Sequence, residues 1–459
     1  MFFSHFLKKI RIFGPYLGIL CAAVGLSYAT ATVPWITALF LGPPEHVGFY
    51  AEGFYLSIAL LFSVGYGLNW FAPRTVIPSF VWAIVFGMAL QIPLAALTTN
   101  TDSLLVVVEL LAAFVLFAGG IEMPVKNFKK YFAPIAALAL GGTILTVFLF
   151  AYALSGLTAL FGLEVPVMAL LVLSAILASV DPTAIIPTLD RLHFRKPFLR
   201  DIAVSESAIN DVVGTILTRF FLVAAIGTSA AAASVREGFL PILARDVMEG
   251  FALEVLWGIL VGVLGAWILR TWGESVRTLH WSDPALFFAV PIFCFALGSL
   301  VGGSGFLAAF VAGLLFDSKT ETREVRHFFH TLVDHLIKPI IFILLGALVP
   351  MSMLVDTIGI GFLAAIVFMF VVRPVVVFIS LLPWMWAGND LISWREALFL
   401  SFIRETGAIP AILILSAVAA GLVASEFVFA VGMWVILLTL MVEPPLTPLL
   451  AHRLGISEQ

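Results

Sequence analysis

Charged residues are scarce in this chain of 459 residues: Asp, Glu, Lys and Arg make up 11% of it, against 62% hydrophobic residues. A soluble domain carries about 25% charged residues, so an ordinary water-facing surface cannot be built from this composition. Only two cysteines are present, Cys21 and Cys294, and both lie inside apolar runs, which argues against a disulfide framework. Basic runs interleaved with aromatic residues are also lacking, so a nucleic-acid-binding surface is not expected.

Long hydrophobic runs take the place of polar surface. A membrane-spanning helix needs roughly 20 apolar residues, and helices satisfy their own backbone hydrogen bonds in lipid. The alternating strands of a lipid-facing barrel do not occur. The sequence therefore predicts an all-α polytopic membrane protein with about 13–14 transmembrane helices, surrounded by lipid and holding no cofactor. We place the spans at 15–41, 50–72, 76–97, 103–121, 131–161, 166–188, 201–227, 247–270, 284–301, 303–317, 335–351, 358–383, 396–419 and 424–449.

Basic residues divide unevenly between the loops of this arrangement. Of the 24 Lys and Arg residues, eighteen lie in one set of alternate loops, two (Arg236 and Arg245) lie in the opposite set, and four lie inside spans. Because cytoplasmic loops collect Lys and Arg, we expect both termini in the cytoplasm. The expected location is the plasma (inner) membrane of a bacterium.

Two spans carry helix-breaking interruptions. The first is Ser179-Val180-Asp181-Pro182, and the second runs from Thr406 to Pro410. Proline removes a backbone donor and disfavours helix in the residue before it. One interpretation is that these prolines merely kink ordinary membrane helices; the other is that the backbone groups they free belong to a transport site.

The positions of the two breaks favour a transport site. The whole chain, 1–459, is expected to form one transporter domain. If 15–41 is an extra N-terminal helix and 247–270 a linker helix, residues 50–227 and 284–449 form two six-helix repeats of inverted orientation. Each break then falls in the fifth span of its repeat. Matching broken helices in inverted repeats indicate a binding site near the middle of the membrane.

Ionisable side chains inside a membrane span are costly and point to function by default. The span 201–227 contains Glu206 and Asn210 on one helical face, with Ser207 and Asp211 on the adjacent stripe. Asp211 lies roughly 15 Å along the helix from its cytoplasmic end. Acids, a hydroxyl and an amide can thus converge with backbone carbonyls freed at the Asp181 break, and hard oxygen ligands suit Na+ or K+. The alternative is that these polar residues face lipid headgroups.

A buried carboxylate for which a cation and a proton compete provides an exchange mechanism. The condition is that the empty, charged site cannot move from one side of the membrane to the other. We assign that role to Asp211. Arg373 needs a counter-charge, and Glu206 is the natural candidate. We expect this buried ion pair to maintain the structure of the site. Arg404 and Glu405, beside the second break, are expected to pair locally and compensate the charge of the exposed helix ends.

Other ionisable residues give weaker signals. Lys338 begins the span 335–351, and we expect it to extend toward the cytoplasmic interface as an anchor. Arg219 is expected to do the same at the outer side. Three histidines, His327, His330 and His335, are placed on a cytoplasmic loop, where solvation is the default expectation.

Several of these segments resemble the monovalent cation:proton antiporter family of the NhaP/NHE type. Asp181-Pro182-Thr183-Ala184-Ile185 is similar to the broken helix of that family, and Ser205 through Asp211 is similar to its Ser-Glu-Ser…Asn-Asp signature. Residues 303–313, GSGFLAAFVAG, and Arg373-Pro374 resemble two further segments. The resemblance covers roughly residues 70–445.

The resemblance implies an NhaA/NhaP-like fold with crossed broken helices, assembled as a homodimer of elevator-type transporters. It implies Asp211 as the ion and proton carrier, with Asp181, Thr183 and Ser207 assisting coordination. Glu206 would pair with Arg373 near Asn210. In this family an Asn-Asp pair accompanies electroneutral one-for-one exchange. The chain departs from the family at Arg404-Glu405-Thr406, where Arg-Gly is common, and Glu405 adds a carboxylate.

The sequence thus predicts a Na+/H+ antiporter rather than an enzyme, with K+ or Li+ as alternative cations. A cation channel is a second class, but channels usually form selectivity rings by symmetry. An intramembrane serine protease is a third class, because Gly302-Gly303-Ser304-Gly305 resembles a nucleophile motif. A protease would need a histidine base inside the membrane. No histidine lies inside any of the later spans, because His335 is at a loop edge and His452 follows the last span.

Overall fold

The computed structural model describes residues 2–42, 50–75, 77–123, 130–180, 189, 192–227, 235–239, 245–275, 284–316, 323–349, 351–386, 392–403 and 406–457. These residues form helices and connecting turns; their β-structure is one isolated antiparallel bridge between Phe194 and Ser457. The predicted all-α class is confirmed. The chain divides into two compact units, Met1–Val106 with Asp334–Val355 and Val107–Val333 with Asp356–Gln459.

The first unit is built from helices near the N-terminus and one helix from much later in the chain. Within it, α4 packs against α18 and α3, and the rings of Phe80 and Phe342 lie 5.0 Å apart. Its helices are α1 (Phe2–Thr32), α2 (Pro34–Leu41), α3 (Ala51–Phe71), the 3-10 helix η1 (Ala72–Arg74), α4 (Ser79–Ala89), α5 (Ala95–Thr98) and α18 (Lys338–Ala347). Three segments run across the sequence boundary between the units: α6 (Thr101–Glu122), the π-helix η6 (Val333–Ile337) and α19 (Met351–Asp356).

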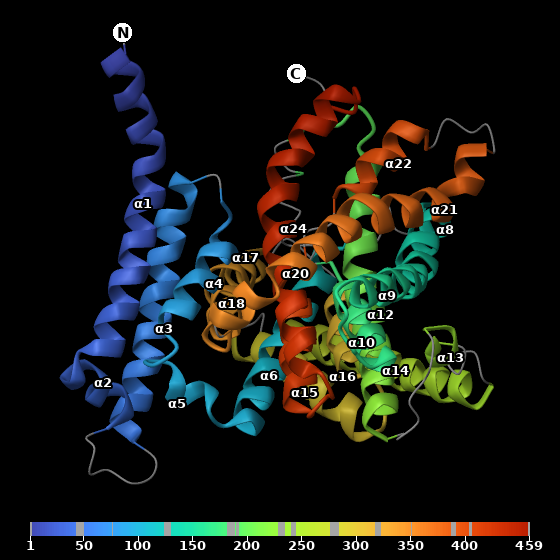
Figure 1. Cartoon of the computed structure of the whole chain (residues 1–459). Helices are drawn as coiled ribbons and strands as arrows, with labels where there is room; N and C mark the ends of the chain where they lie inside the picture. Colours follow the sequence, from blue (N-terminus) through green and yellow to red (C-terminus); the bar gives the residue numbers. More distant parts are fainter. Residues whose placement is uncertain are drawn as a thin grey trace. The chain divides into compact units, whose positions relative to one another are not determined.

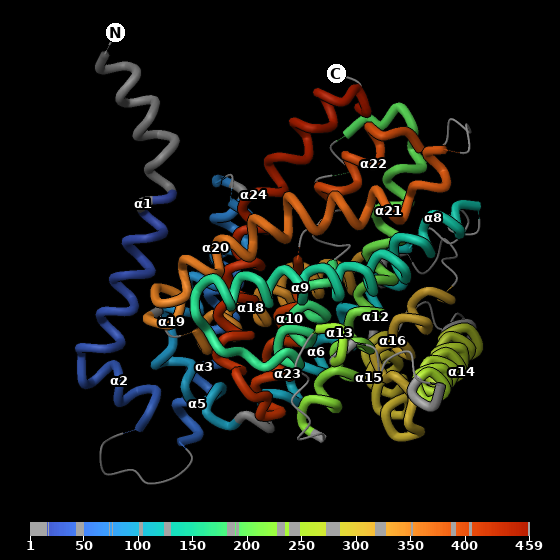
Figure 2. Tube along the Cα trace, turned by 45° about the vertical axis from the view of Figure 1, so that its right-hand side comes forward, coloured from blue at the N-terminus to red at the C-terminus, as the bar shows by residue number. Residues whose placement is uncertain are grey.

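The second unit contains the polar helix α12 and both interrupted helices. Apart from the segments that cross the boundary, its described elements are α8 (Phe132–Ala136), the π-helix η2 (Ala137–Gly142), α9 (Thr143–Leu160), α10 (Val167–Leu177), α12 (Phe198–Gly227), α13 (Val235–Phe239), α14 (Arg245–Ser275), α15 (Pro284–Leu300), α16 (Gly305–Leu314), α17 (Arg323–Leu332), α20 (Ile358–Val367), the π-helix η7 (Phe368–Val372), α21 (Arg373–Trp386), α22 (Trp394–Ser401), α23 (Ala408–Ala419) and α24 (Ser425–Arg453). The helix α9 runs beside the continuous rod α20–η7–α21, and α12 packs against α10 (Figures 1 and 2).

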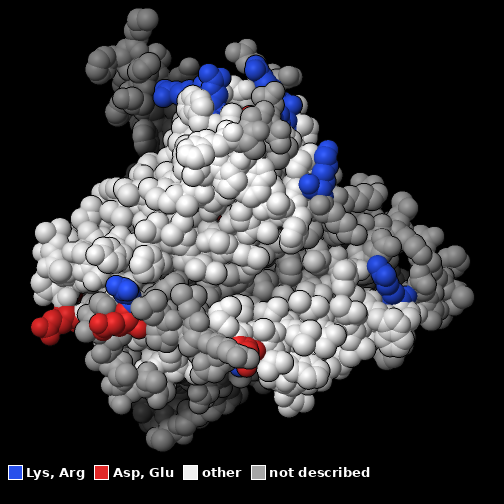
Figure 3. All heavy atoms as spheres, turned by 90° about the vertical axis from the view of Figure 1, so that its right-hand side faces the viewer, with Lys and Arg blue, Asp and Glu red and all other residues white. Residues whose placement is uncertain are grey.

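The described helices reproduce the order of the predicted spans. Eight are long and apolar enough to cross a membrane, α1 and α2 form a further candidate span bent by 83°, and five shorter apolar helices complete the set. Each of these fourteen apolar segments overlaps one predicted span. Figure 3 shows a face whose described surface is largely free of charged side chains, as lipid contact requires.

Helix ends are found at both predicted interruptions. The helix α10 ends at Leu177, and Ser179 and Val180 are not helical. Six residues, 402–407, separate α22 from α23, and four of them are described. Because α10 contacts α23, the two interrupted helices meet inside the second unit.

A close approach between α12 and the end of α10 brings the polar helix to the first break. A Cβ at Gly214 would collide with Ser179 Oγ and would lie 3.3 Å from both Ala175 O and Ser179 N. An alanine here would require the Ser179 side chain to move and the backbone at the end of α10 to shift slightly, so glycine favours this close approach of α12.

We expect Gly214→Ala to destabilise the protein by about 1–3 kcal/mol, the usual cost of overpacking a filled interior. Thermal unfolding of the purified protein in detergent measures the effect. The matched control is Gly156→Ala, an exposed position on α9 where an added Cβ meets nothing within 4 Å. A Gly214→Ala protein as stable as the Gly156→Ala protein would contradict the close approach.

Candidate functional site

The polar stretch of α12 is buried. Ser205, Glu206, Ser207, Asn210 and Asp211 are each at most 3% exposed. Buried polar groups cost free energy unless they are hydrogen-bonded, and buried charges cost more unless they are paired. The contacts of these side chains therefore decide what the stretch does.

Two of these side chains hold the backbone at the first helix break. Asn210 Oδ1 accepts a hydrogen bond from the N–H of Val180 at 3.0 Å. Ser207 Oγ donates to the carbonyl oxygen of the same residue at 2.7 Å. The backbone groups of Val180, which the end of α10 leaves without helical partners, are thus satisfied by α12. The residue that precedes Asp181 is thereby fixed against the helix that carries Asp211.

Sequence reasoning assigned Ser207 and Asn210 to cation coordination and missed this contact with the backbone. Their three-residue spacing does place them on neighbouring turns of one helix side. A broken helix nearby also implies freed backbone groups in need of partners. Which side chain meets which backbone group follows from the packing of α10 on α12, which the sequence does not display.

Glu206 and Arg373 form a buried ion pair. Arg373 Nη2 lies 2.7 Å from Glu206 Oε1 and 2.9 Å from Oε2, and the two side chains are 4% exposed or less. Arg373 is the first residue of α21, directly after the π-helix η7. The predicted partners are therefore brought together from helices far apart in the sequence.

Asp211 lies near the middle of the candidate span Phe198–Ile226 and is 2% exposed. Its carbonyl oxygen accepts a hydrogen bond from Thr215 Oγ1 at 2.7 Å, one turn further along α12. The carboxylate is thus far from either end of a long apolar helix. An ionised carboxylate at this depth is costly, which makes it a candidate for binding a proton or a cation.

Threonines of α24 contact the second helix break. Thr447 Oγ1 donates to the carbonyl oxygen of Phe402 at 3.3 Å, just after α22 ends. The hydroxyls of Thr406 and Thr439 are hydrogen-bonded to each other, just before α23 begins. Neither α24 threonine carries a signal in the sequence alone, although both lie in a span adjacent to the break.

Four predicted site residues lie outside the described part of the chain. Asp181 and Thr183 follow Val180 at the first break, and Arg404 and Glu405 fall within the second. Their assigned roles therefore stay predictions. The described residues on either side place both breaks in the second unit.

The interpretation of Lys338 as an interfacial anchor is wrong. Its side chain is fully buried, and Nζ lies 3.1 Å from Asp334 Oδ1. The candidate span runs from His327 to Ala347, so Lys338 sits in its middle and not at its start. The error arose because the polar stretch before residue 335 was interpreted as a loop, whereas it is helical.

The same error affected the histidines. His327 and His330 lie on α17, and His330 Nδ1 is 3.0 Å from Glu122 Oε1.

Arg219 is about half exposed and lies 3.5 Å from Glu254, as a residue near a membrane boundary would. The side chain of Ser304, the nucleophile of the protease alternative, is buried and caps α16 by accepting from Leu307 N at 3.2 Å.

Removing either partner of the Glu206–Arg373 pair leaves a lone buried charge. We expect Glu206→Gln and Arg373→Met each to lower the free energy of unfolding by about 3–5 kcal/mol. The double variant should lose less free energy of unfolding than the two single variants added together, because no lone charge remains. Denaturant unfolding in detergent provides the measurement, and Arg219→Met is the control, with an expected loss of about 0–1 kcal/mol for a half-exposed pair. Additive losses in the double variant would show that the pair is not coupled.

Comparison with known proteins places these features in a family. Residues 57–452 match the family described as "Sodium/hydrogen exchanger, transmembrane". The K(+)/H(+) antiporter NhaP2 of Shewanella baltica (strain OS223) is 27% identical over 397 residues, which make up 85% of this chain and 65% of the relative. The K(+)/H(+) antiporter NhaP of Alkalimonas amylolytica is 26% identical over 84% of this chain and 64% of its own length. This chain therefore spans less than two-thirds of the length of these relatives.

Two proteins of Methanocaldococcus jannaschii are also similar. One, named "Probable Na(+)/H(+) antiporter 2", is 26% identical over 78% of this chain and 82% of its own length. The other is the sodium proton antiporter MjNhaP1, whose structure at pH 8 matches with a TM-score of 0.69 at 20% identity, over 88% of this chain and 99% of that one. The fold is therefore shared with MjNhaP1. Since the matched family covers most of the sequence, the chain belongs to the sodium/hydrogen exchanger family of integral membrane transporters.

Proposed function

We propose that this protein is a secondary antiporter that exchanges K+ for H+ through the carboxylate of Asp211. The observation that carries the proposal is the burial of Asp211 in mid-span on α12, the helix that holds the backbone of the first break. Broken helices near the middle of the membrane are where transporters of this kind bind ions. Membership of the exchanger family supports the same activity.

Exchange follows from the cost of a buried charge. An empty, ionised Asp211 is expensive in a low-dielectric interior, and the binding of either a proton or a cation lowers that cost. The neutral states can cross between inward-facing and outward-facing conformations, whereas the empty charged state cannot. Uptake of one ion on one side then requires release of the other, by elevator-type alternating access.

The cation ligands are proposed to come from both sides of the first break. Val180 is fixed on α12 by Asn210 and Ser207, which sets the starting point of the segment that follows. Asp181 and Thr183 of that segment are proposed to add oxygen ligands beside Asp211. Ser207 and Asn210 then support the site mainly by positioning this backbone. The oxygen ligands are of the type that alkali cations prefer.

K+ is favoured over Na+ as the transported cation by the names of the relatives. The proteins of Shewanella baltica and Alkalimonas amylolytica are named K(+)/H(+) antiporters. Na+, which the sequence alone favoured, is the second candidate, supported by the relative named a probable Na(+)/H(+) antiporter. Li+ is a minor alternative.

A one-for-one, electroneutral stoichiometry is proposed because Arg373 balances the charge of Glu206. Proton exchange is then assigned to Asp211 alone on α12. Arg404 and Glu405 are proposed to compensate the helix ends at the second break, and Glu405 is the residue whose participation would change the stoichiometry.

The proposed setting is a bacterial plasma membrane, with both termini cytoplasmic and two copies forming a homodimer. The repeats are proposed as 50–227 and 284–449, with 15–41 as an additional helix and 247–270 as the linker. Inverted repeats with matching broken helices are a common plan for secondary transporters, which supports this division of the chain.

Asp211→Asn and Asp211→Ala are expected to reduce cation-induced proton movement in proteoliposomes to the level of protein-free vesicles. A pH-sensitive dye inside the vesicles reports the movement after K+ is added outside. Asp201→Asn is the matched control, since Asp201 lies in the first turn of the same helix and should leave exchange intact. Full exchange by a well-folded Asp211→Ala protein would overturn the assignment.

Selectivity and stoichiometry are measured with the same vesicles. K+, Na+ and Li+ are supplied in turn, and we expect the largest proton movement with K+. A thiocyanate gradient sets the membrane potential, because a potassium ionophore would dissipate the gradient under test. An electroneutral exchanger keeps its rate when the potential is imposed; a rate that follows the potential would rule out one-for-one exchange.

A further inference from the structure

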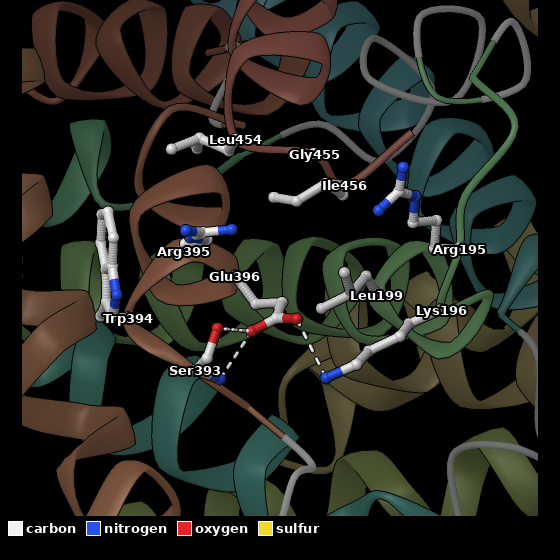
Figure 4. A pocket seen from close by; sticks show the side chains of 10 residues that line it. All are labelled: Arg195, Lys196, Leu199, Ser393, Trp394, Arg395, Glu396, Leu454, Gly455 and Ile456. Atoms are coloured by element: carbon white, nitrogen blue, oxygen red, sulfur yellow. Dashed lines mark hydrogen bonds and ion pairs between the residues drawn. The ribbon is translucent and has the colours of Figure 1, made fainter. Parts of the chain in front are cut away.

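A basic pocket lies in the second unit, outside the site around Asp211. Three segments far apart in the sequence meet there: the residues before α12, the first turn of α22 and the residues after α24 (Figure 4). Its volume is about 440 Å3. The lining residues are Arg195, Lys196, Leu199, Ser393, Trp394, Arg395, Glu396, Leu454, Gly455 and Ile456.

Backbone bonds fix one wall of this basic pocket. The helix α24 ends at Arg453, and Gly455 adopts a positive φ of 70°, a conformation that favours glycine. Ile456 N then bonds back to Ala451 O at 2.9 Å, which closes the helix end. Arg195 N donates to Ile456 O at 2.9 Å, so the backbone of Arg195 is tied to the end of α24.

The capped start of α22 forms the opposite wall. Ser393 caps the helix, and its N–H donates to Glu396 Oε2 at 2.6 Å. The other carboxylate oxygen of Glu396 lies 3.0 Å from Lys196 Nζ. Glu396 is the one acid among the described residues that line the pocket, and both of its carboxylate oxygens are engaged. The charge of Lys196 is therefore balanced inside the pocket.

Two further positive charges line the pocket, those of Arg195 and Arg395. Among the residues that the structure describes, neither Arg195 nor Arg395 forms a salt bridge. Figure 4 shows their guanidinium groups on opposite sides of the pocket. The group of Arg395 lies 5.5 Å from the ring centre of Trp394. The pocket thus presents two unbalanced guanidinium groups from separate walls.

Guanidinium groups match the oxygens of phosphate groups through paired hydrogen bonds, which makes arginine the preferred residue for phosphate recognition. The pocket volume falls within the roughly 300–1,000 Å3 of small-molecule sites, so it admits a phosphorylated molecule and not only a bare ion. Leu199, Leu454 and Ile456 provide apolar surface for the remainder of such a ligand.

We propose that this basic pocket binds a phosphate group, with Arg195 and Arg395 as its two ligands. The phosphate is carried either by a lipid headgroup or by a soluble phosphorylated molecule. A bound phosphate joins the starts of α12 and α22 to the end of α24. It therefore connects the helix of Asp211 with the first half of the second interrupted helix. The proposal does not depend on which cation is transported.

The test measures the unfolding temperature of the purified full chain in detergent with neutral lipid. The probes are inorganic phosphate and glycerol 3-phosphate, compared with sodium chloride of equal ionic strength, and phosphatidylglycerol, compared with phosphatidylcholine. The variant is R195A/R395A, and the matched control is R453A, which removes a charge from the last turn of α24 at an exposed position outside the pocket. Size-exclusion profiles and unfolding temperatures without probe establish that both variants fold.

We expect at least one phosphate probe to raise the unfolding temperature of the native chain and of R453A, and not that of R195A/R395A. Loss of each arginine should weaken binding roughly ten- to hundredfold, the usual value of a hydrogen bond to a charged group. R195K/R395K should bind with intermediate affinity, because lysine keeps the positive charge but cannot form the paired hydrogen bonds of a guanidinium group.

The two sources of phosphate give different results. A shift with the soluble probes in neutral lipid assigns a soluble ligand, whereas a shift with phosphatidylglycerol alone assigns a headgroup. The proposal is overturned if a phosphate probe raises the unfolding temperature of R195A/R395A as much as that of the native chain. It is also overturned if no probe gives a rise that depends on the two arginines. Because transport is not measured, failure here is separate from failure of the proposed antiport.

Discussion

The contact between α12 and the backbone of Val180 is the constraint on which the polar centre of the second unit depends. A helix that stops inside a membrane protein leaves N–H and C=O groups that neither lipid nor helix can satisfy. Asn210 and Ser207 satisfy both groups of Val180 from one helix. The break can therefore persist at depth, and the segment that begins with Asp181 starts from a fixed position.

The helix α12 also carries two buried carboxylates, Glu206 and Asp211. Glu206 is balanced by Arg373 within the protein, whereas the charge of Asp211 is assigned to the ions that the protein carries. One stretch of α12 thus combines three tasks: anchoring a break, closing an ion pair to α21 and presenting a carboxylate. The absence of a side chain at Gly214 brings this stretch close enough to α10 for the first task.

The sequence was sufficient for the fold class, the order of the apolar segments, both helix breaks and the Glu206–Arg373 pair. These follow from composition, from proline chemistry and from the need of a buried charge for a partner. The depth of Lys338 was not predictable from hydropathy, because an apolar window locates the middle of a span but not a polar helix that leads into it. The anchoring of Val180 and the basic pocket depend on segments that meet only in the folded chain, such as Arg195 and Ile456.

The π-helix η7 has a consequence for how this protein can vary. Each residue turns an α-helix by about 100°, so the wider turn at Phe368–Val372 sets the direction in which the following Arg373 points. Residues within the turn can be exchanged for others of similar size. Removing or adding a single one would rotate Arg373 away from Glu206 and leave both charges buried alone. The chain length of this segment is therefore under stricter physical control than its composition.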